Sequence, residues 1–576
     1  MTTSNCDYLD MFCVSKYISI NELNPMRCYG SNIFNIFNHI EWNSFKKVSS
    51  NMLKIYGTYH LLSKLYQKTP YFKTIFFKLI KKNAYVRSII THETQKIRHD
   101  IKNDLNKSIE GNTLFLTLPD DGKTDKFIVD TIKSYRNENN KMVDLTKLSG
   151  CIYHQETELD TTMSLIFPYF YRSNPLHPDV FPYIRKMEAE IISMCAHLMN
   201  SPNPNAGCFT SGGTESILLA CKTYRDIAYE RGIKEPEIIV SKNAHAAYWK
   251  AGQFFNIKIV EIESFYNDSY DYDDTSVNDD GSDVNNTYCE PICLSLIAIL
   301  ENVINKNTIA IIASTPSFNH GIIDPIKKIA DIATKNNLYL HLDHCLGGFI
   351  IPFLKNNTKY DFSVQGVSSI SMDTHKYGNG PKGGSVLLYN DIELYKKQAF
   401  VKEDWSGGIY GTSNITGSRD GNAISLTWAT MMKIGYNGYN LNAHKISKLT
   451  RYLASQLNLI SDIFVYGNPA TCIVGIGSYT LNIYLLSDAL KELGWNLNVL
   501  QHPASFHLCI TNVHTKEIID TFIKDIRNSV TIIVSQKHTN TPLKVKSIYG
   551  TTQKIQDGEI ISDVVREYIC CLNELQ

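Results

Sequence analysis

Short apolar runs alternate with longer amphipathic stretches between about residue 115 and residue 430. The runs are rich in Ile, Val and Leu and cover residues 237–240, 257–262, 308–313, 338–342 and 367–371. They show no regular polar alternation, as expected of strands that are buried on both faces. Helical patterns lie between them, for instance over residues 215–229 and 325–335. This order of strands and helices predicts an α/β fold with a mostly parallel central sheet.

The two ends of the chain differ from this middle part. Residues 1 to about 110 are rich in Asn, Lys and Tyr and have weak helical periodicity. Helical patterns at 441–456 and 484–493 and short strands at 464–466 and 506–511 predict a smaller C-terminal α+β domain. We therefore expect an N-terminal helical segment or arm over residues 1–150, a large domain over 151–430 and a small domain over 431–576. Within the large domain, residues 267–290 carry seven Asp and no Lys or Arg, which predicts an acidic surface insertion.

Charge and cysteine usage narrow the class of protein. Lys+Arg and Asp+Glu both number 57, so the formal net charge is zero and nothing supports a nucleic-acid-binding protein. The 14 cysteines are scattered without a CxxC pair, so no metal site is indicated. Many free thiols in a long chain favour a reducing compartment, and we expect a cytoplasmic protein.

No stretch of the chain resembles a secretory signal or a spanning helix. The nearest candidate, residues 52–80, is interrupted by several lysines, by His60 and by Pro70, and we reject it as a membrane span. Residues 71–82 are basic and aromatic, which suits peripheral contact of the 52–82 region with an anionic membrane surface. A helix packed on the protein body or on a partner subunit explains the same pattern equally well.

A segment rich in glycine and hydroxyl residues, TSGGTES at residues 210–216, directly precedes one amphipathic helix. Free N–H groups at a helix start, together with the helix macrodipole, favour a bound phosphate. Glycines let the backbone approach such a group, and hydroxyls add donors. The alternative is an ordinary N-cap turn.

Two charged residues stand at the ends of two predicted strands. Asp343 ends one strand, in HLDHCLGG, and Lys376 follows another, in SMDTHKYG. A buried carboxylate needs a cationic partner, although Asp343 could instead bond turn amides. A lysine in a low-dielectric site is expected to have a depressed pKa, which makes its amine nucleophilic toward an aldehyde. The alternative for Lys376 is a solvated lysine at a strand end.

The order of these three features is informative. A phosphate cradle, an Asp after one strand and a Lys about thirty residues later after another strand are arranged as in enzymes that use pyridoxal 5'-phosphate (PLP). We therefore predict PLP as the cofactor, with Lys376 forming its Schiff base and Asp343 pairing with its ring nitrogen. The predicted fold is the PLP-dependent transferase fold type I, which is aspartate-aminotransferase-like.

Several longer segments resemble the sphingosine-1-phosphate lyases, a branch of the PLP-dependent group II decarboxylase family. The similar segments are SNPLHPDVFPYIRKMEAEI (173–191), TSGGTESILLACKTYRD (210–226), STPSFNHGIIDPI (314–326), SMDTHKYGNGPKG (371–383), DWSGGIYGTSNITGSRDG (404–421), GWNLN (494–498) and IYGTTQ (548–553). The resemblance covers roughly residue 75 to the end.

The resemblance implies further site residues. It implies that His245, in NAHAAY, stacks on the cofactor ring. It implies that three residues hold the cofactor phosphate: Gly213, Thr214 and His375. It implies that four residues serve the substrate and its proton transfers: Tyr153, His177, Lys382 and Tyr410. Without the resemblance, His245 and His177 would more simply be core histidines.

The resemblance also implies an activity, which is retro-aldol cleavage of a phosphorylated sphingoid base to a long-chain aldehyde and phosphoethanolamine in a homodimer. An amino-acid decarboxylase of the glutamate or aromatic type is the alternative enzyme, and a catalytically silent binding protein is a further alternative. The chain departs from the family at His344, where Ala is usual, and this puts the cofactor geometry in question. The family's eukaryotic members have an N-terminal membrane helix, whereas lysines break the corresponding stretch here. Attachment to the cytosolic face of the endoplasmic reticulum is therefore open.

Overall fold

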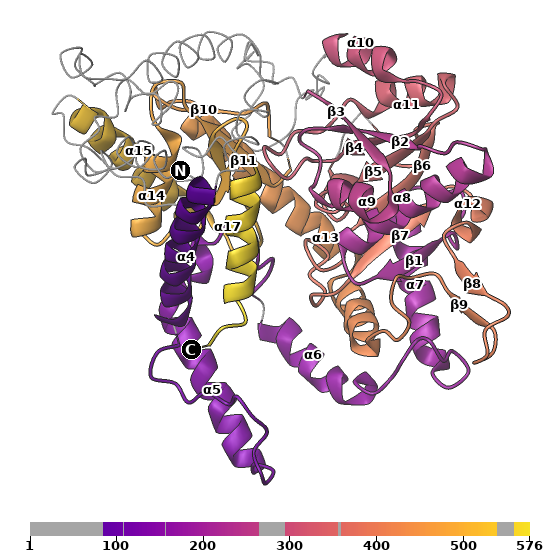
Figure 1. The fold of residues 1–576 in the computed structure, drawn as a ribbon, viewed down its shortest axis with the longest axis horizontal. Helices are drawn as coiled ribbons and strands as arrows, with labels where there is room; N and C mark the ends of the chain where they lie inside the picture. Colours follow the sequence, from indigo (N-terminus) through magenta and orange to yellow (C-terminus); the bar gives the residue numbers. More distant parts are fainter. Residues whose placement is uncertain are drawn as a thin grey trace, which may run out of the picture. The chain divides into compact units, whose positions relative to one another are not determined.

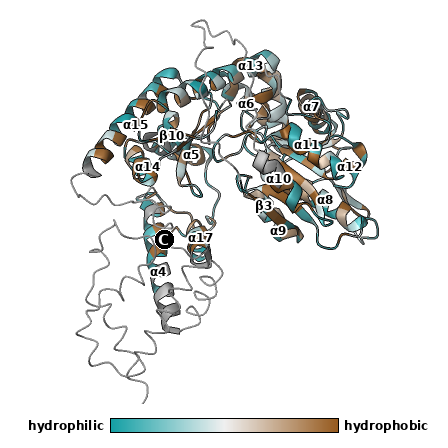
Figure 2. Ribbon diagram, turned by 90° about the horizontal axis from the view of Figure 1, so that it is seen from above, coloured by the Kyte–Doolittle hydropathy of each residue, from teal (hydrophilic) through white to brown (hydrophobic). Residues whose placement is uncertain are grey.

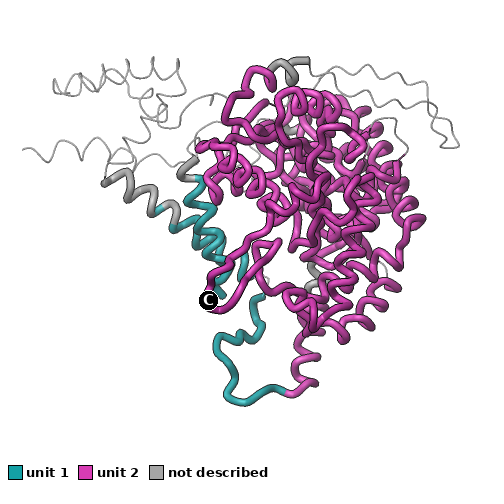
Figure 3. The backbone as a smooth tube through the Cα atoms, turned by 90° about the vertical axis from the view of Figure 1, so that its right-hand side faces the viewer, with its two compact units in different colours: residues 1–123, 540–576 teal, residues 124–539 magenta. Residues whose placement is uncertain are grey.

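The computed structural model describes residues 84–107, 109–155, 157–263, 294–354, 359–469, 471–537 and 558–575. The acidic segment 267–290 and the candidate membrane segment 52–82 lie outside the described residues. The chain divides into two compact units, Met1–Lys123 with Asn540–Gln576 and Thr124–Thr539 (Figure 3). Among the described residues, no helix is long and apolar enough to cross a bilayer.

The smaller unit is built on two packed helices, α4 (Ala84–Lys107) and α17 (Gly558–Cys571). Arg98 of α4 pairs with Glu567 at 2.8 Å and with Glu574 beyond the end of α17. These side chains remain about a third exposed, so water screens the ion pairs and they contribute little stability. The first and last described parts of the chain therefore form one structure.

The larger unit contains a seven-stranded sheet in the order β1-β7-β6-β5-β4-β2-β3. Its strands are β1 (Gly207–Thr210), β2 (Glu237–Ser241), β3 (Lys258–Ile262), β4 (Thr308–Ser314), β5 (Tyr339–Asp343), β6 (Val367–Met372) and β7 (Ser385–Tyr389). The pairings among β2 to β6 are all parallel, and only β7 runs against its neighbours. The predicted mostly parallel α/β sheet is confirmed.

The burial of each strand depends on whether it lies at the centre or at the edge of this sheet. Every residue of β4 and of β6 is buried, and since successive side chains point to opposite faces, both faces of the sheet centre are covered. The prediction of two-sided burial is wrong for β3, where Lys258 and Glu261 are exposed. β3 is the edge strand, so solvent reaches one side of it.

Three described helices of the larger unit, α5 to α7, precede its first strand, and the next ones follow individual strands in the predicted α/β alternation (Figure 1). They are α5 (Asp125–Met142), α6 (Thr157–Phe170), α7 (Pro182–Leu198), α8 (Gly213–Glu230), α9 (Ala247–Phe255), α10 (Leu294–Val303), α11 (Ile326–Lys335) and α12 (Ile392–Lys396), with short 3₁₀ turns at Leu145–Lys147 and Ile351–Phe353. Helix α8 is the most deeply packed, because Ile217, Cys221 and Tyr224 all face the sheet core at i, i+4, i+7 spacing.

A second sheet follows in the chain, in the order β10-β11-β13-β12, and all its pairings are antiparallel. Its strands are β10 (Phe464–Val465), β11 (Ile473–Gly477), β12 (Asn498–Leu500) and β13 (Ser505–Cys509), with helices α14 (Ile483–Glu492) and α15 (Lys516–Lys537). A small hairpin, β8 (Phe400–Lys402) with β9 (Tyr410–Thr412), precedes it.

The long helix α13 (Gly421–Leu457) joins the regions of the two sheets. It packs on α6 and α7 in its first part and on α15 and β11 in its second. Figure 2 shows both hydrophilic and hydrophobic residues around α13 and α15. At Gly435, with φ 62° and ψ 175°, the backbone of α13 leaves helical geometry, and only glycine adopts such a conformation without strain.

Candidate active site

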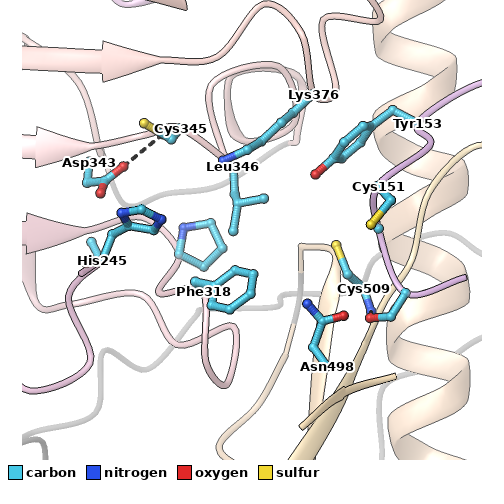
Figure 4. A pocket seen from close by; sticks show the side chains of 14 residues that line it. Cys151, Tyr153, His245, Phe318, Asp343, Cys345, Leu346, Lys376, Asn498 and Cys509 are labelled. Atoms are coloured by element: carbon cyan, nitrogen blue, oxygen red, sulfur yellow. Dashed lines mark hydrogen bonds between the residues drawn. The ribbon is translucent and has the colours of Figure 1, made fainter. Parts of the chain in front are cut away.

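A cavity of about 270 Å³ lies within the larger unit. Residues from both sheets line it: Ser149, Gly150, Cys151, Tyr153, His245, Ser314, Pro316, Phe318, Asp343, Cys345, Leu346, Lys376, Asn498 and Cys509 (Figure 4). Lys376, Asp343, His245 and Tyr153, four of the residues predicted from the sequence, are therefore in one cavity.

Two adjacent parallel strands place Asp343 and Lys376. Asp343 is the last residue of β5 and pairs in register with Ser371 of β6, and Lys376 follows in the turn after β6. Because the carboxyl ends of parallel strands meet at one edge of the sheet, both side chains reach the same space. Asp343 Oδ1 accepts a hydrogen bond from the Cys345 N–H at 3.1 Å, and its Oδ2 has a longer contact, 3.4 Å, with the Tyr248 hydroxyl.

The amine of Lys376 lies 2.8 Å from Oδ2 of Asp373, a carboxylate whose side chain is 2% exposed. Burial alone would lower the pKa of Lys376, but the negative charge of Asp373 raises it above its ordinary value. The expectation of a depressed pKa for Lys376 is therefore wrong for this arrangement of the side chains. Asp373 was not singled out in the sequence analysis, because the turn that brings it to Lys376 has no sequence signal.

The glycine-rich loop connects β1 to α8 and contacts the turn after β6. Gly212 has φ 148°, and a Cβ there would lie 3.2 Å from the ring of His375. A Cβ on Gly213 would lie 2.7 Å from both Asp373 Oδ1 and Cys345 Sγ. The loop thus needs glycine for close approach, while Thr214 at the start of α8 is exposed. The fold brings together the three residues predicted to hold a phosphate.

A second buried carboxylate that the sequence did not single out holds this loop in place. Glu215 accepts hydrogen bonds from the N–H groups of Ser211 at 2.7 Å and Ile415 at 2.9 Å. It therefore joins the glycine-rich loop to the segment that follows β9.

His245 lies in the loop between β2 and α9, and its ring is edge-on to Phe318 at 6.5 Å. Its Nδ1 accepts a hydrogen bond from the Ala247 N–H at 3.2 Å. His245 and His177 are both exposed, so the alternative that they are core histidines is wrong.

Lys382 lies beside Tyr153, which lines the cavity, but Lys382 is not itself among the lining residues. The Lys382 amine is 4.7 Å from the centre of the Tyr153 ring and donates to the His375 carbonyl at 3.3 Å. Burial raises the pKa of Tyr153, so its hydroxyl keeps its proton at neutral pH. Burial lowers the pKa of Lys382, which makes its proton easier to remove.

Two other predicted substrate residues do not line this cavity either. His177 is exposed in a turn before α7, and Tyr410 in β9 packs against Phe400 and Trp405. Asn174 joins their segments, since its side chain donates to Ser418 Oγ at 3.0 Å and accepts from the Arg419 N–H at 3.2 Å. The roles of His177 and Tyr410 stay predictions.

His344, the departure from the family pattern, points away from the cavity. Its Nε2 contacts the Tyr360 carbonyl at 2.5 Å, its ring is 1% exposed, and it is not among the lining residues. Burial lowers the pKa of His344 to about 4, so the ring is neutral at physiological pH. The extra imidazole therefore adds no charge beside Asp343.

The donor set of the cavity fits PLP. Asp343 keeps one carboxylate oxygen with only a 3.4 Å contact, which leaves it able to accept from a protonated ring nitrogen. Oδ1 of Asp373 has no hydrogen-bond partner among the described atoms, and it lies beside the glycine-rich loop. An aldehyde carbon would meet the Lys376 amine, and the start of α8 offers free N–H groups for a phosphate.

Comparison with known proteins agrees with this fold and cavity. Residues 291–474 match the pyridoxal-dependent decarboxylase conserved domain. A glutamate decarboxylase from Lactobacillus brevis has a similar structure, with a TM-score of 0.60, 18% identity and coverage of 76% of this chain and 98% of that one. At that identity the likeness concerns the fold alone. The chain is therefore a PLP-dependent enzyme of fold type I.

Closer relatives define the family. The chain is 38% identical over 507 residues to sphingosine-1-phosphate lyase 1 of Mus musculus, covering 87% of this chain and 84% of the mouse protein. It is 33% identical to the lyase of Saccharomyces cerevisiae, with 91% and 86% coverage. The structure of a Burkholderia pseudomallei sphingosine-1-phosphate lyase matches with a TM-score of 0.66 and 29% identity over 75% of this chain and 96% of that one. The chain belongs to the sphingosine-1-phosphate lyase family.

Proposed function

We propose that the chain cleaves phosphorylated sphingoid bases such as sphingosine 1-phosphate between C2 and C3, giving a long-chain aldehyde and phosphoethanolamine. The observation that carries this proposal is the cavity in which Lys376, Asp343 and Tyr153 meet. When bound, PLP withdraws electrons from the carbon that bears the substrate amine, so that the neighbouring carbon–carbon bond can break.

The residues of the chain take separate parts in this proposal. Lys376 carries the cofactor, and Asp343 keeps its ring nitrogen protonated. His245 would lie against the ring face of bound PLP. Gly213, Thr214 and His375 would hold its phosphate.

Proton transfers fall to Tyr153 and Lys382. Lys382, whose pKa is lowered by burial, suits removal of the proton from the C3 hydroxyl. Tyr153, whose pKa is raised, holds a proton that it can give to C2 after the bond breaks. The Lys382 amine lies 4.7 Å from the centre of the Tyr153 ring, so the two groups are close enough to act on one substrate.

A homodimer would give His177 and Tyr410 a place in the reaction. Both belong to segments with strongly exposed apolar side chains, namely Tyr169, Tyr183, Trp405 and Ile409 at 80%, 71%, 54% and 83%. Covering such side chains with a second copy would remove them from water. His177 and Tyr410 would then face the cavity of the partner and bind the substrate phosphate there.

Two further parts of the proposal concern the rest of the chain. Residues 52–82 make peripheral contact with an anionic membrane, which places the enzyme in the cytoplasm at the cytosolic face of the endoplasmic reticulum. The domain boundaries remain as proposed from the sequence, at residues 150/151 and 430/431. The membrane contact is tested by sedimentation with anionic vesicles: the full chain should bind, and a chain that lacks the residues before 83 should not.

The function is tested by incubating purified, PLP-loaded protein with sphingosine 1-phosphate and measuring the long-chain aldehyde by mass spectrometry. Lys376→Ala should abolish aldehyde formation, since no amine remains to carry the cofactor. Lys396→Ala, on an exposed helix, is the matched control and should retain activity. Full aldehyde formation by Lys376→Ala would refute the assignment of Lys376.

An amino-acid decarboxylase remains the alternative activity. It would require a cation for the substrate carboxylate, and the described lining residues include no arginine. Incubation with glutamate or aromatic amino acids should therefore release no carbon dioxide. Release of carbon dioxide without aldehyde formation from the lipid would favour the decarboxylase instead.

A further inference from the structure

The buried carboxylate of Glu215 receives two backbone N–H groups from different parts of the chain. Glu215 is the third residue of α8 and is 6% exposed. Its Oε2 accepts from the N–H of Ser211, in the glycine-rich loop, at 2.7 Å. Its Oε1 accepts from the N–H of Ile415, in the segment after β9, at 2.9 Å. Each oxygen therefore holds one of the two segments.

The geometry of this contact requires a carboxylate. Both partners are N–H donors, so the side chain between them has to offer two acceptor oxygens. Glutamine has the same length but only one acceptor oxygen, and its NH2 group would face one of the two donors. Glu215→Gln therefore breaks one of the two hydrogen bonds and keeps the size of the side chain.

On one side, the contact reaches the residues that would hold the cofactor phosphate. Ser211 directly precedes Gly212 and Gly213. The first N–H groups of a helix have no partner within the helix and can bind an anion. Glu215 takes the N–H of Ser211, which lies before the helix, and so leaves the N–H groups at the start of α8 to the phosphate. A phosphate bound there would fix the loop and, through Ser211, the carboxylate of Glu215.

On the other side, the contact reaches the hairpin of β8 and β9. Ile415 follows Tyr410 closely in the chain, and the turn of the hairpin exposes Trp405 and Ile409. The Asn414 N–H donates to Oγ1 of Thr412, the last residue of β9, at 3.1 Å. The end of the hairpin and Ile415 therefore belong to one connected segment.

Two further contacts hold this segment on β1 and do not involve the loop. Asn414 Nδ2 donates to the Phe209 carbonyl at 2.8 Å, and Arg419 Nη1 donates to the same carbonyl at 3.3 Å. Arg419 is also paired with Glu188 of α7, with 3.0 Å between Nη2 and Oε2. The segment therefore stays attached to the sheet when Glu215 is changed, and Glu215 supplies the contact that reaches the loop itself.

We propose that Glu215 is a positioning residue that couples occupation of the cofactor phosphate site to the position of the β8–β9 hairpin. A phosphate on the loop stabilises the arrangement in which Ser211 donates to one oxygen of Glu215, and the other oxygen then holds Ile415. The consequence for catalysis rests on the proposed function, in which Tyr410 of this hairpin serves the cavity of the partner. Filling one cavity with PLP would then organise the substrate side of the other.

Hydrogen exchange of the full-length protein, measured by mass spectrometry with and without PLP, tests this coupling. In the natural chain PLP should slow exchange in the peptide that contains the loop and also in the peptide that contains Ile415. With PLP at about 100 times its Kd, exchange that requires release of PLP slows by up to about 100-fold, which is the upper limit for the Ile415 N–H. Slowing that is confined to the loop peptide would overturn the proposal.

Variants distinguish coupling from a merely structural role. Glu215→Gln should still show slowed exchange in its loop peptide, but its Ile415 peptide should exchange equally fast with and without PLP. Glu230→Gln, at the other end of α8, where Glu230 is exposed and pairs with Lys397 at 2.8 Å, is the matched control and should respond like the natural chain. Equal slowing at Ile415 in the natural chain and in Glu215→Gln would overturn the proposal.

A second variant tests the coupling even where Glu215→Gln does not fold. Asn414→Ala loosens the segment from β1 without touching the loop, so its Ile415 peptide should exchange faster and should still be slowed by PLP. Loss of the PLP effect in Asn414→Ala would assign the coupling to β1 and would overturn the role of Glu215. These measurements use no substrate, so the coupling and the proposed lyase activity can fail separately.

Discussion

Replacing Asp373 with Asn removes the charge that holds the amine of Lys376 while keeping the shape of the side chain. The two groups are 2.8 Å apart, and Asp373 is almost fully buried. The variant leaves a buried ammonium without its carboxylate. We expect the protein without PLP to lose stability and the Lys376 amine to lose its proton more readily.

The size of the effect follows from the distance. At 2.8 Å two unit charges attract by about 6 kcal/mol with an effective dielectric constant of about 20. Desolvation offsets part of this attraction, and removal of one partner of a buried pair costs about 3–5 kcal/mol. Since the Lys376 side chain is 21% exposed and can become neutral, we expect about 3 kcal/mol, the lower end of the range.

The pKa change gives a second readout. Burial lowers the pKa of Lys376, and Asp373 reverses that effect, so without Asp373 the pKa falls. Only the neutral amine attacks the aldehyde of PLP. Each unit of fall raises the neutral fraction about tenfold at neutral pH. The assay follows PLP capture by absorbance after mixing with PLP-free protein, over a series of pH values.

Asp373→Asn should therefore capture PLP faster at pH 7.5 although it unfolds at lower denaturant concentration. Asp324→Asn is the matched control. Burial raises the pKa of Asp324 to about 6 and its carboxylate accepts a backbone N–H at 2.7 Å, so its replacement should cost no stability at pH 8 and leave capture unchanged. Unchanged stability together with an unchanged pH profile for Asp373→Asn would refute the reasoning.

Two further predictions concern the loop and the buried histidines. Gly213→Ala places a Cβ 2.7 Å from Asp373 Oδ1, and overpacking of about 1–3 kcal/mol should weaken PLP binding about 5–140-fold in a fluorescence titration. Gly122→Ala, with open space around it, should bind as before, and unchanged binding by Gly213→Ala would contradict the steric argument. Burial lowers the pKa of His320 to about 3 and of His507 to about 4, below the unfolded value of about 6.5. The stability that these two neutral histidines contribute is complete above pH 6.5 and is lost as the pH falls toward 4. Each histidine loses up to about 1.4 kcal/mol for every pH unit in this range. Equal denaturation midpoints at pH 7 and pH 5 would disprove this prediction.

Much of the sheet could be predicted because buried strands need uninterrupted apolar runs. The runs at 237–240, 308–313, 338–342 and 367–371 correspond to β2, β4, β5 and β6. β7 was not singled out, and its reversed direction has no signature in an apolar run. The exposure of β3 was readable in principle, because Lys258 and Glu261 interrupt IKIVEI with charges.

The sequence could predict only those residues of the candidate site whose positions are determined by the ends of strands. Asp343 and Lys376 follow adjacent parallel strands, so their convergence was deducible from the pattern. The contact of Lys376 with Asp373 depends on the path of the turn after β6, which a sequence does not specify. The positions of exposed His177 and half-buried Tyr410 outside the cavity likewise depend on packing. Possession of a family motif does not place a side chain in the cavity of its own chain.

The break in α13 at Gly435 has a consequence for how a long lipid reaches the cavity. The walls that carry Asp343 and Lys376 belong to one sheet, and the wall with Asn498 and Cys509 belongs to the other. Helix α13 connects the two, and its only non-helical torsion lies at Gly435. Rotation about this glycine can part the walls only if hydrogen bonds between them break, such as those between the Tyr377 hydroxyl and the Ile510 carbonyl at 2.7 Å and between His507 Nδ1 and the Asn319 carbonyl at 2.8 Å. Entry of a long acyl chain therefore requires these contacts to open together with the glycine hinge.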